Sequence, residues 1–297
     1  MKNPLTTVTS VLGTPTHSGS GYAIYQGDCL ELMGQLPDEV ITLTVTSPPY
    51  NIGKEYEEVL SIGEYLDWCE SWIKEIHRST VPSGAFWLNL GYVSLPDRAK
   101  AIPLPYMLWD RVPFYLIQEV VWNYGAGVAA KKFFAPRNEK FLWYVKDQGD
   151  YVFNLDDVRD PNVKYPNQKK NGKKKCNPIG KNPSDVWQFP KVTSGKNRSS
   201  KERTGHPAQF PVAVIDRIVK ACSNAGDLIL DPFVGSGSLI EAALMNDRVA
   251  VGIEINAEYA DMAAQRIESY LRRRRADEAQ QVLFGPVRNL VSASSWV

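Results

Sequence analysis

Short apolar runs and amphipathic segments alternate along the chain. Five runs of mainly apolar or β-branched residues predict strands, over residues 22–25, 41–46, 85–90, 115–122 and 141–145. Apolar residues from Tyr65 to Ile76 recur every three or four positions and predict an amphipathic helix, which Pro82-Ser83-Gly84 is expected to close. A shorter helix is predicted over residues 29–33. Strands that alternate with helices favour a mostly parallel sheet covered on both faces.

The last third of the chain repeats this alternation as a complete βαβ unit. From residue 206 onward the pattern predicts a helix lined by Val212 to Cys222, a strand at 227–231, a helix at 238–245, a strand at 249–253 and a helix at 257–270. The two ends of the chain differ from this pattern. Residues 1–20 are rich in Thr, Ser and Gly and are expected to form a flexible N-terminal arm, and residues 276–297 a C-terminal tail.

Between residues 156 and 205 the chain becomes polar and basic. Twelve Lys or Arg stand against two acids from Lys164 to Arg203. A charge run is usually a solvated or disordered face. The interleaved aromatic residues Tyr165, Trp187 and Phe189 indicate a partly ordered surface instead.

Composition narrows the class of protein. The 297 residues suit one large α/β domain with an added module, or two small domains, and 43% hydrophobic residues suffice for a core. A net charge of +1 provides no global field for nucleic acid. Four cysteines without C-x-x-C spacing argue against a zinc ribbon and a disulfide framework. A reduced, cytoplasmic location fits, and no apolar stretch is long enough to cross a membrane.

The tetrapeptide Ser47-Pro48-Pro49-Tyr50 directly follows the run at 41–46. Two prolines stop the strand and hold the flanking carbonyls in place, because proline fixes φ and lacks an N–H. The Ser47 hydroxyl and the Pro48 carbonyl can accept hydrogen bonds from an exocyclic amine, while the Tyr50 ring can stack on a base drawn out of a helix. Taken alone, the same residues also suit a plain turn at a sheet edge.

A glycine-rich turn, Asp231-Pro-Phe-Val-Gly235-Ser-Gly237, lies between a predicted strand and a predicted helix. Glycines let a backbone approach a ligand closely, and the helix start supplies free N–H donors. The turn is neither a P-loop nor a full dinucleotide fingerprint. Glu254 ends the next strand, where an acid about twenty residues after the glycines can hold two ribose hydroxyls. Turn and acid together predict a nucleoside cofactor site without a charge for a pyrophosphate.

Thr46-Ser-Pro-Pro-Tyr50, the glycine turn and the following Ile253-Glu254 together resemble the motifs of exocyclic-amine DNA methyltransferases that use S-adenosylmethionine. The resemblance extends over residues 21–270. The tetrapeptide precedes the glycine turn, with the basic segment between them, which resembles the β group of that family. The stretches Gly27-Asp28, Asn182–Trp187 and His206–Pro211 are similar to shorter motifs of the same group.

The resemblance implies a class I methyltransferase, Rossmann-like fold. This is a doubly wound, mostly parallel, seven-stranded sheet whose last strand is antiparallel, with an inserted basic target-recognition region. The chain then divides into a catalytic half at 21–155, the target-recognition region at 156–205 and an S-adenosylmethionine-binding half at 206–275. The strands ending at Ser47 and Asp231 are expected to be neighbours at the switch point, where open α/β sheets bind ligands.

The resemblance also implies roles for individual residues. The catalytic residues are expected to be Ser47, Pro48, Pro49 and Tyr50. S-adenosyl-L-methionine is expected to contact Asp28, His206, Phe210, Asp231, Pro232, Phe233, Gly235, Ser236, Gly237 and Glu254. Double-stranded DNA is expected to dock through Lys173, Lys174, Lys175, Lys181, Lys196 and Arg198. Phe133 or Phe134 is a further candidate for lining the target pocket, residues 51–56 form either a loop over the base or a plain connection, and Arg272 to Arg275 are expected to cap the last helix.

The implied reaction is methyl transfer to an exocyclic amine. The lone pair of such an amine is delocalised into the ring, and two acceptors that pull its hydrogens out of plane oppose that delocalisation. No covalent intermediate and no metal is required. Cytosine C5 methylation would need a cysteine nucleophile, typically after a proline, and no cysteine follows a proline here. Serine before Pro-Pro-Tyr is more usual among cytosine-N4 enzymes of the family, so cytosine N4 is favoured and adenine N6 is the alternative.

Two competing functions and several partners stay open. An RNA or protein methyltransferase is disfavoured by the motif order, and a binding protein that lost catalysis is disfavoured by the intact motifs. A restriction-modification or an orphan role is expected, with a cognate restriction endonuclease as a candidate partner. The chain is compatible with a monomer or a homodimer, and its recognition sequence cannot be read from a variable segment.

Overall fold

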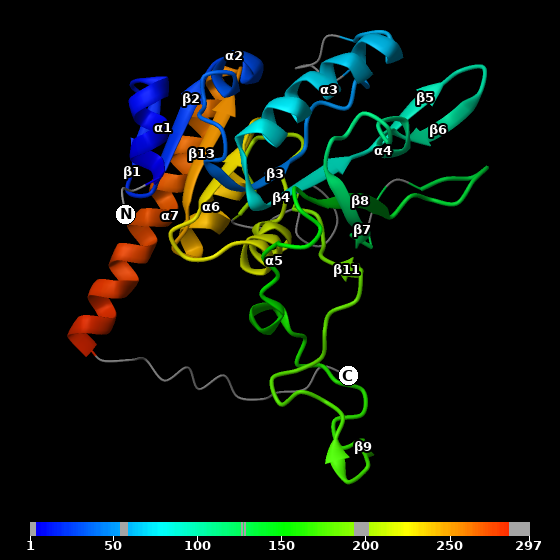
Figure 1. The fold of residues 1–297 in the computed structure, drawn as a ribbon, viewed down its shortest axis with the longest axis vertical. Coiled ribbons are helices and arrows are strands. Elements are labelled where there is room, and N and C mark those ends of the chain that lie inside the picture. Colours follow the sequence, from blue (N-terminus) through cyan, green and yellow to red (C-terminus); the bar gives the residue numbers. More distant parts are fainter. Residues whose placement is uncertain (1–3, 54–58, 126, 128, 193–201, 285–297) are drawn as a thin grey trace.

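The computed structural model describes residues 4–53, 59–125, 127, 129–192 and 202–284. Its centre is a nine-stranded sheet in the order β1-β2-β13-β12-β3-β4-β8-β7-β11 (Figure 1). In chain order the strands are β1 (His17–Gly19), β2 (Tyr22–Gln26), β3 (Ile41–Thr46), β4 (Thr80–Leu90), β7 (Tyr115–Asn123), β8 (Asn138–Val145), β11 (Val186–Gln188), β12 (Leu228–Asp231) and β13 (Val249–Glu254).

The seven expected strands form the middle of this sheet. Neighbours from β2 through β13, β12 and β3 to β4 are parallel, whereas β8 is antiparallel to both β4 and β7. The sequence predicted that the last strand would be antiparallel. The antiparallel strand is instead β8, an inner strand from the middle of the chain. It runs antiparallel because a direct loop joins β7 to its neighbour β8, without a crossover helix. β1 and β11 extend the two edges.

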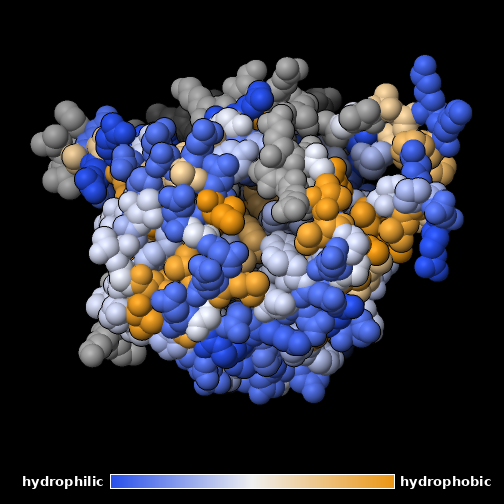
Figure 2. All heavy atoms as spheres, turned by 90° about the horizontal axis from the view of Figure 1, so that it is seen from above, coloured by the Kyte–Doolittle hydropathy of each residue, from blue (hydrophilic) through white to orange (hydrophobic). Residues whose placement is uncertain are grey.

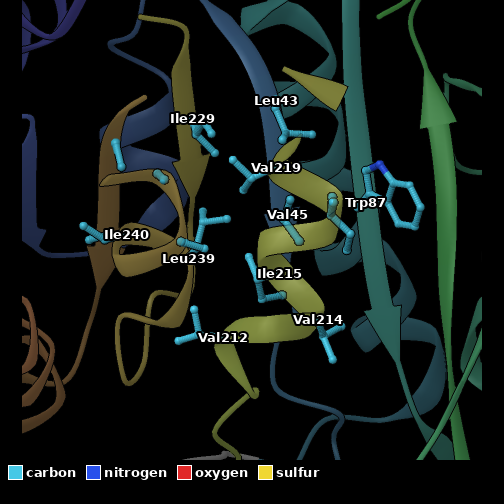
Figure 3. Close-up of a cluster of buried hydrophobic side chains, with 14 of the residues drawn as sticks. Leu43, Val45, Trp87, Val212, Val214, Ile215, Val219, Ile229, Leu239 and Ile240 are labelled. Atoms are coloured by element: carbon cyan, nitrogen blue, oxygen red, sulfur yellow. The ribbon is translucent and has the colours of Figure 1, made fainter. Parts of the chain in front are cut away.

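Helices cover both faces of the sheet. One face packs against α5 (Val212–Cys222), α6 (Ser238–Met245) and α7 (Ala257–Phe284), and the other against α1 (Pro4–Leu12), α2 (Cys29–Met33), α3 (Ile62–Ser79) and α4 (Leu104–Met107). Figure 3 shows the first core, in which side chains of α5 meet Leu43 and Val45 of β3 and Trp87 of β4. The mainly parallel doubly wound sheet predicted from the sequence is confirmed.

The N-terminal arm predicted as flexible is folded in the described residues. Val8 of α1 is fully buried, and the helix packs on β2 and β13. The Tyr25 hydroxyl donates to the Gly13 carbonyl at 3.2 Å, and the Gln26 N–H donates to Thr16 Oγ1 at 2.9 Å. The prediction was wrong because one buried side chain and these tertiary contacts outweigh the weak helix propensity of threonine.

Two predicted element ends are also wrong. The helix α3 ends at Ser79, and the segment Pro82–Gly84 lies inside β4, where an irregularity in the β3–β4 pairing accommodates it. The last helix does not end at Tyr270 but continues to Phe284, into the predicted tail. Arg274 therefore lies within α7 and caps the preceding helix instead, donating to the Leu244 carbonyl and to Asp247.

Two excursions leave the body of the sheet (Figure 1). The first consists of the hairpin of β5 (Tyr92–Leu95) and β6 (Ala99–Pro103) and the loop between β7 and β8. The second begins after the 3-10 helix η1 (Leu155–Val158) and carries the small hairpin of β9 (Lys169–Lys170) and β10 (Lys173–Lys174). Trp187 of β11 returns to the core and stacks on Trp87 with 5.7 Å between ring centroids, so the basic segment is partly ordered, as predicted.

Candidate active site

The tetrapeptide, the glycine turn and the acid lie at one edge of the sheet. β12 pairs in parallel with β3 on one side and with β13 on the other, which confirms the predicted neighbours. Ser47–Tyr50 follow β3, the glycine turn begins at Asp231, the last residue of β12, and Glu254 ends β13. Because parallel strands present their carboxyl ends at the same edge, all three segments face one another there.

A chain of hydrogen bonds connects the tetrapeptide to β4. Ser47 Oγ lies 2.9 Å from the Tyr50 hydroxyl, which donates to Asn89 Oδ1 at 2.5 Å. Asn89 is fully buried, and its Nδ2 donates to the Lys140 carbonyl on β8 at 2.9 Å. This last bond fixes the orientation of the amide, so Asn89 Oδ1 has to be the acceptor.

The direction of this chain decides which way Ser47 can act. Tyr50 has a single hydroxyl hydrogen, and it is donated in the hydrogen bond to Asn89 Oδ1. The Ser47 hydroxyl therefore donates its hydrogen bond to the Tyr50 oxygen, or to Asn89 Oδ1 at 3.5 Å. The lone pairs of Ser47 Oγ are then left to accept hydrogen bonds from a substrate.

Two contacts hold the rest of the tetrapeptide in place. A side chain at Gly91 would meet the Tyr50 ring at 2.7 Å, so the ring packs where only a glycine leaves room. The Tyr65 hydroxyl of α3 donates to the Pro49 carbonyl at 2.7 Å. Among the residues that the structure describes, none donates to the Pro48 carbonyl, which leaves it able to accept a substrate N–H.

The segment after Tyr50 is closed into a loop by a single side chain. Asn51 has a φ of 60°, in the left-handed region, and its amide bonds to both the N–H and the carbonyl of Leu60, at 2.8 and 2.9 Å. Residues 54–58, and with them part of the predicted loop over the base, lie outside the described residues.

Asp231 connects the two motifs below the site. It is buried, and its Oδ1 accepts from Thr46 Oγ1 at 2.7 Å and from the Phe233 N–H at 3.1 Å. Burial raises the pKa of this carboxyl to about 7, and the nearby charge of Glu254 adds to the shift. Asp231 thus couples β12 to β3, next to Ser47.

Glu254 supports the glycine turn from β13. Its two carboxylate oxygens accept from the N–H groups of Gly235, at 2.9 Å, and Asn256, at 3.1 Å. Burial raises the pKa of Glu254 despite these bonds. Gly235 has a φ of 47°, and a side chain there would meet the His206 ring at 3.0 Å. The turn therefore requires glycine at this position for two independent reasons.

His206 and Asp28 complete this half of the site. The His206 ring packs edge-on against Tyr259 at 4.5 Å, and burial lowers its pKa to about 4, so it is neutral at pH 7. The N–H of Ala208 donates to His206 Nδ1 at 3.2 Å. Asp28 caps α2 by accepting from the N–H groups of Leu30 and Glu31, at 2.8 and 3.1 Å.

These residues line one cavity of about 960 Å³. All the predicted catalytic and cofactor-binding residues except Gly237 lie in its wall. Gly237 begins α6 with a φ of 75°, and a side chain there would meet Ala263 of α7 at 3.1 Å. Its glycine is therefore needed for helix packing. Figure 2 looks onto this edge of the sheet and shows a hollow flanked by hydrophobic residues.

Other predicted residues lie away from the cavity. Phe133 and Phe134 are not in its wall, and Phe134 is completely exposed, because the loop between β7 and β8 extends away from the sheet. Lys173, Lys174 and Lys175 are exposed on the β9–β10 hairpin, whereas Lys181 pairs with Asp160 at 3.1 Å. Lys196 and Arg198 lie outside the described residues.

Sequence reasoning missed three residues of the site. Asn89 is a polar residue near the end of an otherwise apolar strand, and that position was the signal that could have revealed it. Glu139 and Lys191 line the cavity, whereas Asn89 lies behind Tyr50, and the two charged side chains form an ion pair at 2.5 Å. They are 52 residues apart, and nothing in their local sequence indicates that they meet.

In the residues that the structure describes, no group of three or more His, Cys, Asp or Glu side chains is placed to hold a metal ion. Within the same residues, no helix is long and apolar enough to cross a membrane.

Comparison with known proteins gives consistent matches over most of the chain. Residues 41–265 match the N6/N4 family described as DNA methylase. The type II methyltransferase M.ScaI of Streptomyces caespitosus is 63% identical over 265 residues, which are 89% of this chain and 87% of the relative. The DNA adenine methyltransferase YhdJ of Escherichia coli (strain K12) is 32% identical over 280 residues, covering 86% of this chain and 85% of the relative.

Solved structures show the same fold. The PvuII DNA methyltransferase, described as cytosine-N4-specific, superposes with a TM-score of 0.68 at 21% identity, over 93% of this chain and 97% of that chain. The complex of M1.HpyAVI with SAM superposes with a TM-score of 0.55 at 22% identity, over 83% and 98% of the two chains.

Proposed function

Because the chain belongs to the N6/N4 DNA methylase family, we propose that it transfers a methyl group from S-adenosyl-L-methionine to the exocyclic N4 of cytosine in double-stranded DNA. The observation that carries this proposal is the hydrogen-bond chain from Ser47 through Tyr50 to Asn89, beside the glycine turn. It aims an acceptor at a substrate amine.

The charges of the cavity support a cationic nucleoside as cofactor. Its wall in this half carries the carboxylates of Asp28, Asp231 and Glu254, and no lysine or arginine of the described lining residues lies among them. Such an acidic wall favours a sulfonium over phosphates even where Asp231 is partly protonated, and Glu254 is the candidate for the ribose hydroxyls. When bound, S-adenosylmethionine supplies a methyl group on a positively charged sulfur, which keeps the electron pair of the broken bond.

The residues on the other side of the transfer prepare the amine. Ser47 Oγ and the Pro48 carbonyl accept hydrogen bonds from the two N–H groups of the amine, which draws the nitrogen lone pair out of conjugation. The Tyr50 ring stacks on the base. Ser47, Tyr50 and Asn89 are all neutral, so none is a strong base. The amine proton is therefore released to solvent after the nitrogen has gained the methyl group and its positive charge.

The choice of cytosine over adenine rests on Ser47. Serine at this position resembles the cytosine-N4 enzymes of the family, while the relative YhdJ, named as an adenine methyltransferase, represents the alternative. A base reaches this depth only if it leaves the duplex, so the proposal includes base flipping.

Transfer of a labelled methyl group tests the proposed activity. Wild type is expected to label duplex DNA, whereas Ser47→Ala is expected to lose at least about 100-fold in rate because a positioned acceptor is worth that much. Calorimetric titration should show that Ser47→Ala still binds S-adenosylmethionine, while Glu254→Ala binds it roughly tenfold or more weakly, since hydrogen bonds to a charged group are removed. Wild type that binds no cofactor would refute the proposal.

A further inference from the structure

Part of the cavity wall comes from residues outside the tetrapeptide and the cofactor motifs, and we call this part the second compartment. Six of its lining residues are Tyr92, Trp122, Tyr124, Asn138, Glu139 and Lys191, from the start of β5, from the ends of β7 and β8 and from the segment after β11. Among the described lining residues of the whole cavity, Lys191 is the one lysine or arginine.

Strand register places this compartment beside the Tyr50 ring. Leu90 and Lys140 form the last pair of β4 with β8, and the residues just beyond this pair, Gly91 and Glu139, both line the cavity. The Tyr50 ring occupies the space where a side chain of Gly91 would lie. The Tyr50 ring therefore lies at the same end of the β4–β8 ladder as Glu139.

Lys191 is held in a fixed position by Glu139 and two rings. Its Nζ lies 2.5 Å from Glu139 Oε1 and 3.9 Å from the centre of the Tyr124 ring, and about a quarter of its side chain is exposed. Two neighbouring donors are engaged, because Trp122 Nε1 donates to the Phe189 carbonyl and the Tyr124 hydroxyl to the Asn138 carbonyl. An ammonium has three hydrogens, so Lys191 keeps donors beyond the one given to Glu139.

Cytosine and adenine differ in what they present to such a donor. Both carry an amine next to a ring nitrogen acceptor, but only cytosine carries a carbonyl, O2, on the other side of that nitrogen; adenine has a C–H there. We propose that Lys191, positioned by Glu139, donates to O2 of the flipped cytosine and thereby selects cytosine over adenine. This rests on the proposed function and makes Lys191 a specificity-determining residue.

A chemical double-mutant cycle tests the contact. Duplexes carrying the enzyme's own methylation site are prepared with cytosine or 2-thiocytosine at the target, since sulfur is a much weaker acceptor than oxygen. For wild type, the sulfur substitution should lower kcat/KM roughly tenfold or more, as expected for a hydrogen bond to a charged donor. For Lys191→Met, activity on cytosine should be reduced by a similar factor, and the sulfur substitution should change little further.

Controls separate this contact from a general structural effect. Lys146→Met removes another partly buried lysine, which pairs with Glu39 at 3.5 Å and is not in the cavity wall, and it should keep the wild-type sensitivity to sulfur. The double variant Lys191→Met/Glu139→Gln leaves no unpaired carboxylate, so it should fold as wild type does and behave like Lys191→Met.

Three outcomes would overturn the inference. The first is an equal sulfur penalty in wild type and Lys191→Met. The second is coupling of Lys191 to a methylphosphonate at the target nucleotide, which would mean a phosphate contact instead. The third is N6-methyladenine as the wild-type product, which would overturn the proposed function as well. Either of the first two results, obtained with N4-methylcytosine as the product, would overturn the role of Lys191 and leave the proposed function standing.

Discussion

At the scale of single residues, the orientation of the Ser47 hydroxyl depends on the direction of one hydrogen-bond chain. Tyr50→Phe keeps the ring that stacks on the base but removes the oxygen that takes the Ser47 proton. We expect kcat to fall about tenfold or more while the KM for DNA changes little, since the missing contribution is orientation of the acceptor. Tyr50→Ala should raise the KM as well. A wild-type kcat in Tyr50→Phe would show that Ser47 is oriented by something else.

Asp231 makes stability depend on pH in a direction that can be measured. Its folded pKa of about 7 exceeds the ordinary value of 3.8, so the folded protein binds the proton more tightly than the unfolded chain, and stability is lost as pH rises toward 7. Asp231→Asn keeps an acceptor for Thr46 and Phe233 without the charge. Relative to wild type, its free energy of unfolding should therefore increase by about 2 kcal/mol between pH 5 and pH 8, measured by urea denaturation at each pH. A pH-independent difference would contradict the buried carboxyl.

The candidate site was predictable at this scale where the chemistry is local. Ser47–Tyr50, the glycine turn and Glu254 are contiguous or regularly spaced, and the structure places them in one wall. Asn89, Glu139 and Lys191 were not predictable, because each comes from a different strand or loop and acquires its role only through strand register.

At the scale of elements, the same contrast separates the strands and helices with a clear period from those without one. Helix α3 has regularly spaced buried residues and a capping box between Ser61 and Glu64, and its existence was predicted. Helix α1 has one buried residue, Val8, among three threonines and a serine, so its sequence resembles a loose arm. The β9–β10 hairpin is specified by the Asn171-Gly172 turn, whose two residues both have positive φ.

That hairpin places lysines opposite one another on its two strands. Lys170 pairs across the strands with Lys173, and Lys169 with Lys174, and like charges placed opposite each other are destabilising without a counterion. We expect Lys173→Gln/Lys174→Gln/Lys175→Gln to weaken DNA binding and to reduce its salt slope by about 0.9 for each phosphate that these lysines neutralise in wild type. Lys74→Gln on α3, which removes an exposed lysine paired with Glu70, should leave the slope unchanged. An unchanged slope in the triple variant would show that these three lysines are exposed to solvent without contacting DNA phosphates.

At the scale of the whole molecule, the parallel centre of the sheet was the most predictable property and the edges the least. Parallel neighbours β13, β12 and β3 follow from alternating strands and helices with ligand motifs at the strand ends. The additions β1 and β11 are three residues each and form only because a sheet edge is available. The same sheet brings two halves of the chain, separated by the basic segment, around one cavity.

The central claim is that this cavity holds a methyl donor on one side and a flipped cytosine on the other. Digestion of DNA methylated in vitro to nucleosides, followed by separation and mass spectrometry, tests it most directly. The account predicts N4-methylcytosine, formed with S-adenosylmethionine by wild type and absent with Ser47→Ala. N6-methyladenine as the sole product would contradict it.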